Sequence, residues 1–110
     1  MILWSRVNEL REEVGPEDFQ EVIDLFLDEV EGVIARLRQD DDRSQLEQDL
    51  HFLKGSALNL GFATFSDLCQ DGERFAAEGK ADDVDVAAIV RGYEHSKTTF
   101  FEGLRDHLAA

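Results

Sequence analysis

The sequence is poor in the residues that cross-link or interrupt a fold, with one cysteine, one proline and no long apolar run. Because Cys69 is the lone cysteine, an internal disulfide is excluded, and we expect an intracellular, cytoplasmic protein. No apolar stretch approaches the ~20 residues that a membrane-spanning helix needs, and no signal-peptide pattern opens the chain. The sequence therefore argues against both a membrane protein and a disulfide-stapled secreted domain.

Positive charge is also scarce. The chain carries 11 lysines and arginines against 25 aspartates and glutamates, for a formal net charge of -14. Such a surface repels the phosphates of nucleic acid, so we expect no nucleic-acid partner. Hydrophobic residues nonetheless make up 43% of the 110 residues, which argues against disorder. A chain of this size has enough residues for a single core, and we expect one domain over residues 1–110.

Apolar residues recur at the three- and four-residue spacing of helices, and no sustained alternation indicates a strand. The spacing predicts a short first helix and four longer ones, and the residues that should end the first four are Gly15, the acidic run 40–42, Gly61 and Gly79. The residues expected at the helix starts are Leu3, Pro16, Ser44 with Glu47 in a capping box, and Asp83 or Asp85. The fourth helix is outlined by its apolar stripe, Phe65, Leu68, Cys69, Gly72, Phe75 and Ala76. Four long amphipathic helices with short connections predict an all-α fold, an antiparallel up-down-up-down four-helix bundle whose end is capped by the short first helix.

The third of these helices carries a histidine in an unusual setting. Its apolar stripe is formed by Leu46, Leu50, Leu53, Ala57 and Leu60. At roughly 100° per residue, His51 falls on the opposite side, with Gly55 and Leu58 beside it and Lys54 on the flank. From residue 50 to residue 66 the only fully charged side chain is Lys54. We therefore expect His51 to point to solvent from a nearly uncharged, partly apolar surface.

A surface of this kind around a histidine indicates a docking face. We expect Leu58 and Phe62 to supply its apolar contacts, with Ser56 and Asn59 as further members. Local packing or capping is the alternative explanation for Ser56. Cys69 lies on an apolar stripe of the next helix, so we expect a small buried hydrophobic residue there.

The same residues resemble a family signature. The run His51-x-Leu53-Lys54-Gly55-Ser56 followed by Leu60-Gly61 is similar to the motif of histidine-containing phosphotransfer (HPt) domains. Those domains relay phosphoryl groups between receiver-domain aspartates. Cys69 and Glu73 stand where the family often has a Cys and a Glu or Gln on the next helix, and the likeness extends over essentially the whole chain. The sequence departs from the family at Leu50, where a small residue is common, and its nearest equivalent of an extra basic residue on the second helix is Arg74.

The resemblance implies roles for four side chains. His51 would accept the phosphoryl group, since a neutral imidazole with a pKa near ~6.5 is a good nucleophile near pH 7. Lys54 would bring positive charge to the phosphoryl oxygens, and Gly55 would leave room for a receiver loop. Glu73 would hydrogen-bond the other ring nitrogen and fix the tautomer. The alternatives are an ordinary surface histidine, a solvated lysine, a neutral surface glycine and one more exposed acid.

Other chemistries find little support in the sequence. There is no glycine-rich phosphate loop, so we expect no ATP binding and no autokinase activity. No Glu-x-x-His pair occurs, so a metal site within the bundle is not expected. His95 and His107 lack a Lys-Gly companion. We expect no cofactor in the chain itself, with Mg²⁺ supplied by the partner.

The sequence thus predicts a phosphorelay intermediate that is itself phosphorylated rather than an enzyme with its own substrate. The resemblance implies receiver domains of response regulators and a sensor or hybrid histidine kinase as partners, and we expect a monomer. Two other hypotheses stay open. One is a non-catalytic helical adaptor that uses the same face only for binding, and the other is a four-helix bundle whose surface histidine is incidental.

Overall fold

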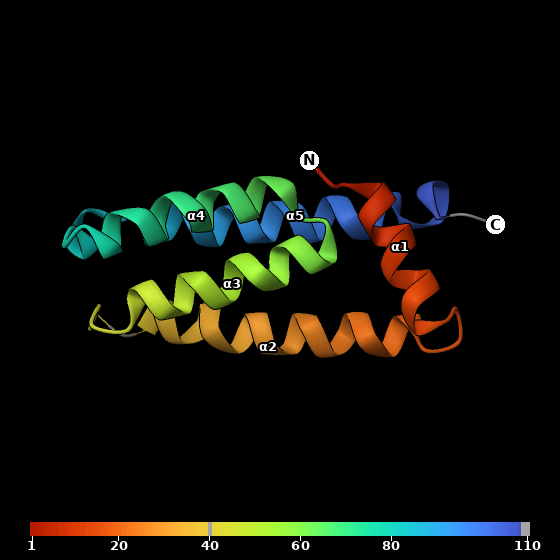
Figure 1. The fold of residues 1–110 in the computed structure, drawn as a ribbon, viewed down its shortest axis with the longest axis horizontal. Helices are drawn as coiled ribbons and strands as arrows, with labels where there is room; N and C mark the ends of the chain where they lie inside the picture. The colour runs from red at the N-terminus through yellow and green to blue at the C-terminus, as the bar shows by residue number, and fades with distance from the viewer. Residues whose placement is uncertain (40, 109–110) are drawn as a thin grey trace.

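The computed structural model describes residues 1–39 and 41–108, and these residues fold as helices without a strand (Figure 1). The helices are α1 (Trp4–Val14), α2 (Phe19–Gln39), α3 (Leu46–Leu60), α4 (Ala63–Ala77) and α5 (Val86–His107), with a short 3₁₀ turn, η1 (Ala81–Asp83), before the last. An isolated bridge joins Ile2 to Phe62. The all-α fold predicted from the sequence is confirmed.

The four long helices run alternately up and down. Figure 1 shows α3 beside α2 and α4, and α5 closing the bundle against α4 and α2. The short helix α1 lies across the end of the bundle at which α3 turns into α4. The predicted up-down-up-down arrangement with a capping first helix is therefore correct. None of the helices in the described part of the chain is both long and apolar enough to span a membrane.

The core runs the length of the bundle and fixes the orientation of α3. The apolar stripe predicted for this helix is buried at all of its positions, Leu46, Leu50, Leu53, Ala57 and Leu60. Aromatic rings of Phe62, Phe65, Tyr93 and Phe100 fill the end of the core nearest α1. Cys69 is fully buried, as expected. Because one stripe of α3 is held inside so completely, the opposite stripe must face solvent.

The turn between α3 and α4 is sharp and depends on a glycine. Gly61 ends α3 with a φ of 75°, in the left-handed region. A Cβ at this position would lie 2.7 Å from the carbonyl oxygen of Leu3, so a side chain is excluded by space as well as by conformation. The turn lets the two helices lie side by side.

Two predicted helix starts are wrong. Pro16 does not open α2, because the chain first closes a turn in which the amide of Asp18 donates to the Gly15 carbonyl at 3.1 Å, and the helix begins at Phe19. The capping box of Ser44 with Glu47 does not form either. The amide of Ser44 donates instead to the side chain of Asp42 at 2.9 Å, and this local turn delays α3 to Leu46.

The remaining helix ends follow the sequence closely. α1 ends at Val14 with Gly15 as its cap, and α4 ends at Ala77, two residues before Gly79. α2 ends at Gln39; Asp40, the first residue of the acidic run, lies outside the described residues. Of the two starts considered for the last helix, Asp85 is correct, since its side chain accepts the amide of Ala88 at 3.0 Å.

Candidate functional site

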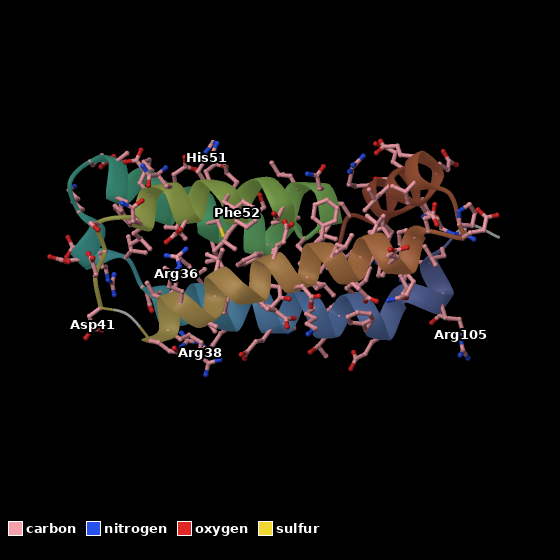
Figure 2. All side chains as sticks on the ribbon, turned by 90° about the horizontal axis from the view of Figure 1, so that it is seen from below. Arg36, Arg38, Asp41, His51, Phe52 and Arg105 are labelled. Carbon is pink, nitrogen blue, oxygen red and sulfur yellow. The ribbon has the colours of Figure 1, made fainter. Side chains whose placement is uncertain are left out.

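His51 lies in the middle of α3 and points away from the bundle (Figure 2). Its side chain is 70% exposed, whereas Leu50 before it and Leu53 after it are fully buried. The prediction that His51 faces solvent is confirmed. An imidazole this open can be reached by a macromolecule as well as by a small molecule.

Glu73 approaches the imidazole from the neighbouring helix α4. Its Oε2 atom lies 2.8 Å from Nδ1 of His51. The residue before it, Gly72, is buried against α3, and a Cβ there would lie 2.8 Å from the Cδ1 atom of Leu50. Gly72 therefore lets α4 pack close enough to α3 for the Glu73 carboxylate to reach the histidine. Because a carboxylate accepts hydrogen bonds, this contact assigns the proton to Nδ1 and leaves the lone pair on Nε2.

Lys54 binds the second oxygen of the same carboxylate. Its Nζ atom lies 2.7 Å from Oε1 of Glu73, so the carboxylate bridges the lysine and the histidine. The close contact with Lys54 is the main cause that holds the pKa of Glu73 below its usual range, while partial burial opposes this and the bond to His51 adds to it. Glu73 is therefore ionised at neutral pH, and Lys54 is a paired, half-buried lysine and not a freely solvated one.

Gly55 and Leu58 complete the exposed side of α3. A Cβ placed on Gly55 would meet nothing within 4 Å, so the space above the helix is open next to His51. Leu58 is 54% exposed. Both positions face outward as predicted. Asn59 is also exposed, but its backbone carbonyl and side chain accept hydrogen bonds from Arg6 of the α1 segment.

Two residues assigned to the docking face are buried, and that assignment is wrong. Ser56 is only 6% exposed because it lies three residues after Leu53 and four before Leu60, on the buried stripe. Phe62 is fully buried. It follows the left-handed Gly61, which turns the chain inward and packs the ring against Tyr93 and Phe100.

One exposed apolar residue beside the histidine escaped the sequence analysis. Phe52 is 39% exposed and lies on the side of α3 that faces α2 (Figure 2). Its position just off the apolar stripe of α3 is the signal that could have identified it. The exposed apolar residues near His51 are therefore Phe52, next to it in the chain, and Leu58, two helical turns later.

Neither the nearby thiol nor a metal cluster competes with the histidine in the part of the chain that the structure describes. Burial raises the pKa of Cys69 to about 12, and the charge of Glu73 adds to the effect. Among the described residues, no three His, Cys, Asp or Glu side chains lie together in a way that could hold a metal ion. Arg74 pairs with Asp71 on its own helix, at 3.5 Å. The histidine, lysine and carboxylate thus form a small site whose accessible nucleophile is Nε2.

The other histidines lie in different settings. His95 is exposed on α5, and His107 stacks on Trp4 with ring centroids 4.5 Å apart.

A comparison with models of protein families matches the Hpt domain over residues 21–110. No curated protein and no solved structure matches the chain.

Proposed function

Since the chain belongs to the Hpt domain family, and involvement in a phosphorelay follows from that membership, we propose that it carries a phosphoryl group on His51 between receiver-domain aspartates. The observation that carries the proposal is the exposed imidazole whose Nδ1 atom lies 2.8 Å from the Glu73 carboxylate. That contact leaves Nε2 as an unprotonated nucleophile directed at solvent.

The chemical step is a displacement at phosphorus. The lone pair of Nε2 attacks the phosphorus of an aspartyl phosphate on the receiver, the N–P bond forms, the P–O bond breaks, and the aspartate leaves as a carboxylate. The ring keeps its Nδ1 proton and becomes positively charged, and the Glu73 carboxylate stabilises that charge through the existing hydrogen bond. The return step to a second receiver runs the same exchange backwards.

Lys54 and Gly55 support this step in different ways. The Lys54 ammonium lies on the Glu73 carboxylate, one helical turn from His51, so a change of side-chain rotamer brings it toward the phosphoryl oxygens. Gly55 leaves the space beside the imidazole open, which gives a receiver loop the in-line access that phosphoryl transfer requires. Leu58 and Phe52 offer apolar contacts to the same partner.

The partners follow from this chemistry. Receiver domains supply the aspartate and the Mg²⁺ ion, and a sensor or hybrid histidine kinase stands upstream of them. We propose that the chain holds no cofactor of its own and has no autokinase activity, because its site consists of an acceptor and the groups that orient it. We also propose that it works as a monomer.

A labelling experiment tests the proposal. The purified protein is mixed with Mg²⁺ and a radiolabelled, phosphorylated receiver, and the label on the chain is tested in acid and in alkali. We expect an acid-labile, alkali-stable label that is lost in His51→Gln and kept in His95→Gln, the matched exposed histidine. An unlabelled wild type across a broad panel of receivers, or equal labelling of His51→Gln, would falsify it.

A non-catalytic adaptor is the second candidate, because Leu58 and Phe52 present apolar surface without any need for chemistry. This candidate predicts that His51→Ala leaves both partner affinity and signalling output unchanged. The relay predicts unchanged affinity with lost output, so measuring the two quantities on one variant separates the candidates.

A further inference from the structure

The face of the bundle opposite His51 carries a groove between α2 and α5. Figure 2 shows His51 at one edge of the molecule and Arg38 at the opposite edge, where α2 and α5 lie side by side. The groove consists of two adjoining hollows of about 400 and 260 Å³, which share Arg38 and Glu94 as lining residues. The apolar part of the larger hollow is formed by Leu37, Val86, Ala87 and Val90.

The charges that line the groove differ from those of the molecule as a whole. Three cations (Arg38, Arg91 and Lys97) stand against two carboxylates (Glu31 and Glu94), in a chain whose net charge is -14. Within the described residues the side chain of Arg91 has no hydrogen-bond or ion-pair partner. The groove is therefore a locally basic strip on an acidic protein.

The two carboxylates are already engaged. Glu31 binds Lys97 and accepts the Tyr93 hydroxyl at 2.7 Å, and the bond from Lys97 is the main cause that lowers the pKa of this glutamate. Glu94 lies 3.6 Å from Arg38, and about 60% of each of these two side chains is exposed. An ion pair this exposed contributes little, so Arg38 can exchange Glu94 for another carboxylate at small cost.

We propose that this groove docks an amphipathic helix of a partner protein, with acidic residues flanking its apolar stripe. From Val86 to Lys97 the groove follows α5 for about 16 Å, the length of a three-turn helix. Apolar side chains of the docked helix would pack on Leu37 and Val90, as in other helix-in-groove complexes, while its carboxylates pair with Arg38 and Arg91.

The charge distribution explains why the occupant is acidic and why it binds here. Acidic side chains outnumber basic ones in the chain as a whole, so an acidic helix is attracted to the basic strip more than to an average part of the surface. The groove lies on the face opposite His51 (Figure 2), so a docked helix leaves the imidazole accessible. This inference does not depend on the proposed phosphotransfer and can stand or fall separately.

The test uses the whole ¹⁵N-labelled protein and two synthetic helical peptides. Both carry one leucine stripe; glutamates flank it in the first peptide and glutamines in the second. We expect the glutamate peptide to shift backbone amide signals of α5 between Val86 and Lys97 and of α2 around Leu37, with those of α3 unmoved. Arg91→Glu should weaken its binding by about fivefold, the upper range for one exposed charge pair.

Arg105→Gln is the matched control, because Arg105 is a basic residue of the same helix at the far end from Arg38 (Figure 2). It should change the affinity by less than about twofold, and circular dichroism checks that each variant is folded. Amide shifts centred on α3, equal binding of the glutamine peptide, or unchanged binding by Arg91→Glu would overturn the proposal. So would a concentration-dependent dimer in sedimentation equilibrium that involves the same amides, because a second copy would then occupy the groove.

Discussion

At the scale of single residues, Glu73 links the nucleophile to the rest of the site. One of its carboxylate oxygens lies 2.8 Å from Nδ1 of His51, and the other lies 2.7 Å from Nζ of Lys54. The two contacts are unequal in their effect, since the contact with the lysine is the larger cause of the lowered pKa of Glu73. The ionisation of Glu73 therefore depends more on Lys54 than on His51.

This inequality gives a direct prediction for the pKa of Glu73. Lys54→Met should raise it toward its usual value, and His51→Gln should raise it less, because the lysine bond is the dominant cause. A ¹³C NMR titration of the carboxyl group measures both changes. Lys80→Met, which removes a lysine near Glu78, is the control and should leave the Glu73 titration unchanged. A larger shift in His51→Gln than in Lys54→Met would contradict the assignment.

The lowered pKa of Glu73 also determines how the stability of the fold changes with pH. A carboxyl group whose folded pKa lies below its unfolded value of 4.5 stabilises the fold above that pH, and this contribution is lost as the pH falls through the folded pKa. Glu73→Gln should therefore be less stable than wild type at about pH 7, and the difference should shrink at about pH 3. Urea unfolding at the two pH values measures it. A difference that grows in acid would show that the ion pair is not its cause.

Cys69 provides a third prediction at the residue scale. Because the thiol is fully buried and its pKa is raised to about 12, it should not react with a disulfide reagent at about pH 8 while the protein is folded. Adding urea should bring the reaction to the rate of a free cysteine. Fast labelling of the native protein would mean that α4 opens locally to expose the thiol.

The residue scale also marks what the sequence could and could not predict about the site. The sequence predicted correctly where three residues of α3 lie, His51, Lys54 and Gly55. Because a stripe of leucines on this helix is buried, the opposite side must face solvent. Phe62 was misplaced because helical periodicity stops at Gly61, and the ring turns into the core after it. The ion pair between Lys54 and Glu73 depends on the distance between α3 and α4, and the spacing of residues along one helix cannot predict that distance.

At the scale of the elements, the packing of α4 on α3 decides whether the site can form. Gly72 lies at a close contact between the helices, where a Cβ would also lie 3.2 Å from the Cδ1 atom of Ile89 on α5. Gly55 on the facing helix has open space instead. Packing therefore requires a glycine at position 72, whereas position 55 has room for a side chain.

This contrast predicts opposite effects of one substitution on stability. Gly72→Ala should destabilise the protein by ~1–3 kcal/mol, because the new methyl group forces Leu50 and Ile89 to move. Gly55→Ala should stabilise it by about 0.5–1 kcal/mol through better helix propensity. Urea unfolding of the two variants checks both signs. A stabilising Gly72→Ala would show that α3 and α4 can separate without cost.

Helix starts were harder to predict than helix ends. Gly15 and Gly61 end their helices because a glycine at positive φ stops the helical repeat whatever surrounds it. The starts depend on competing local hydrogen bonds, and the side chain of Asp42 takes the Ser44 amide before a capping box can use it. Asp85 was predicted correctly as one of two starts because its carboxylate has no such competitor and binds the Ala88 amide.

At the scale of the whole molecule, the first twenty residues lie outside the family match but are tied to the bundle. The amide of Leu3 donates to the Gly61 carbonyl at 2.7 Å, and the amide of Ala63 donates to the Met1 carbonyl at 3.1 Å. Trp4 stacks on Phe100 with ring centroids 5.8 Å apart. The N-terminal segment thus covers the aromatic end of the core and packs against the turn that positions α3 and α4.

This integration predicts one cooperative unfolding transition, which would also test the expectation of a single domain over residues 1–110. Trp4 is the only tryptophan, so its fluorescence reports whether α1 is docked, while circular dichroism at 222 nm follows all the helices. Because releasing α1 would uncover the ring of Phe100, which is fully buried, the two signals should change at the same urea concentration. Val7→Ala, which removes buried methyl groups from α1, should shift both midpoints equally. A fluorescence transition at lower urea than the circular dichroism transition would show instead that α1 is a separable cap on an independently stable four-helix bundle.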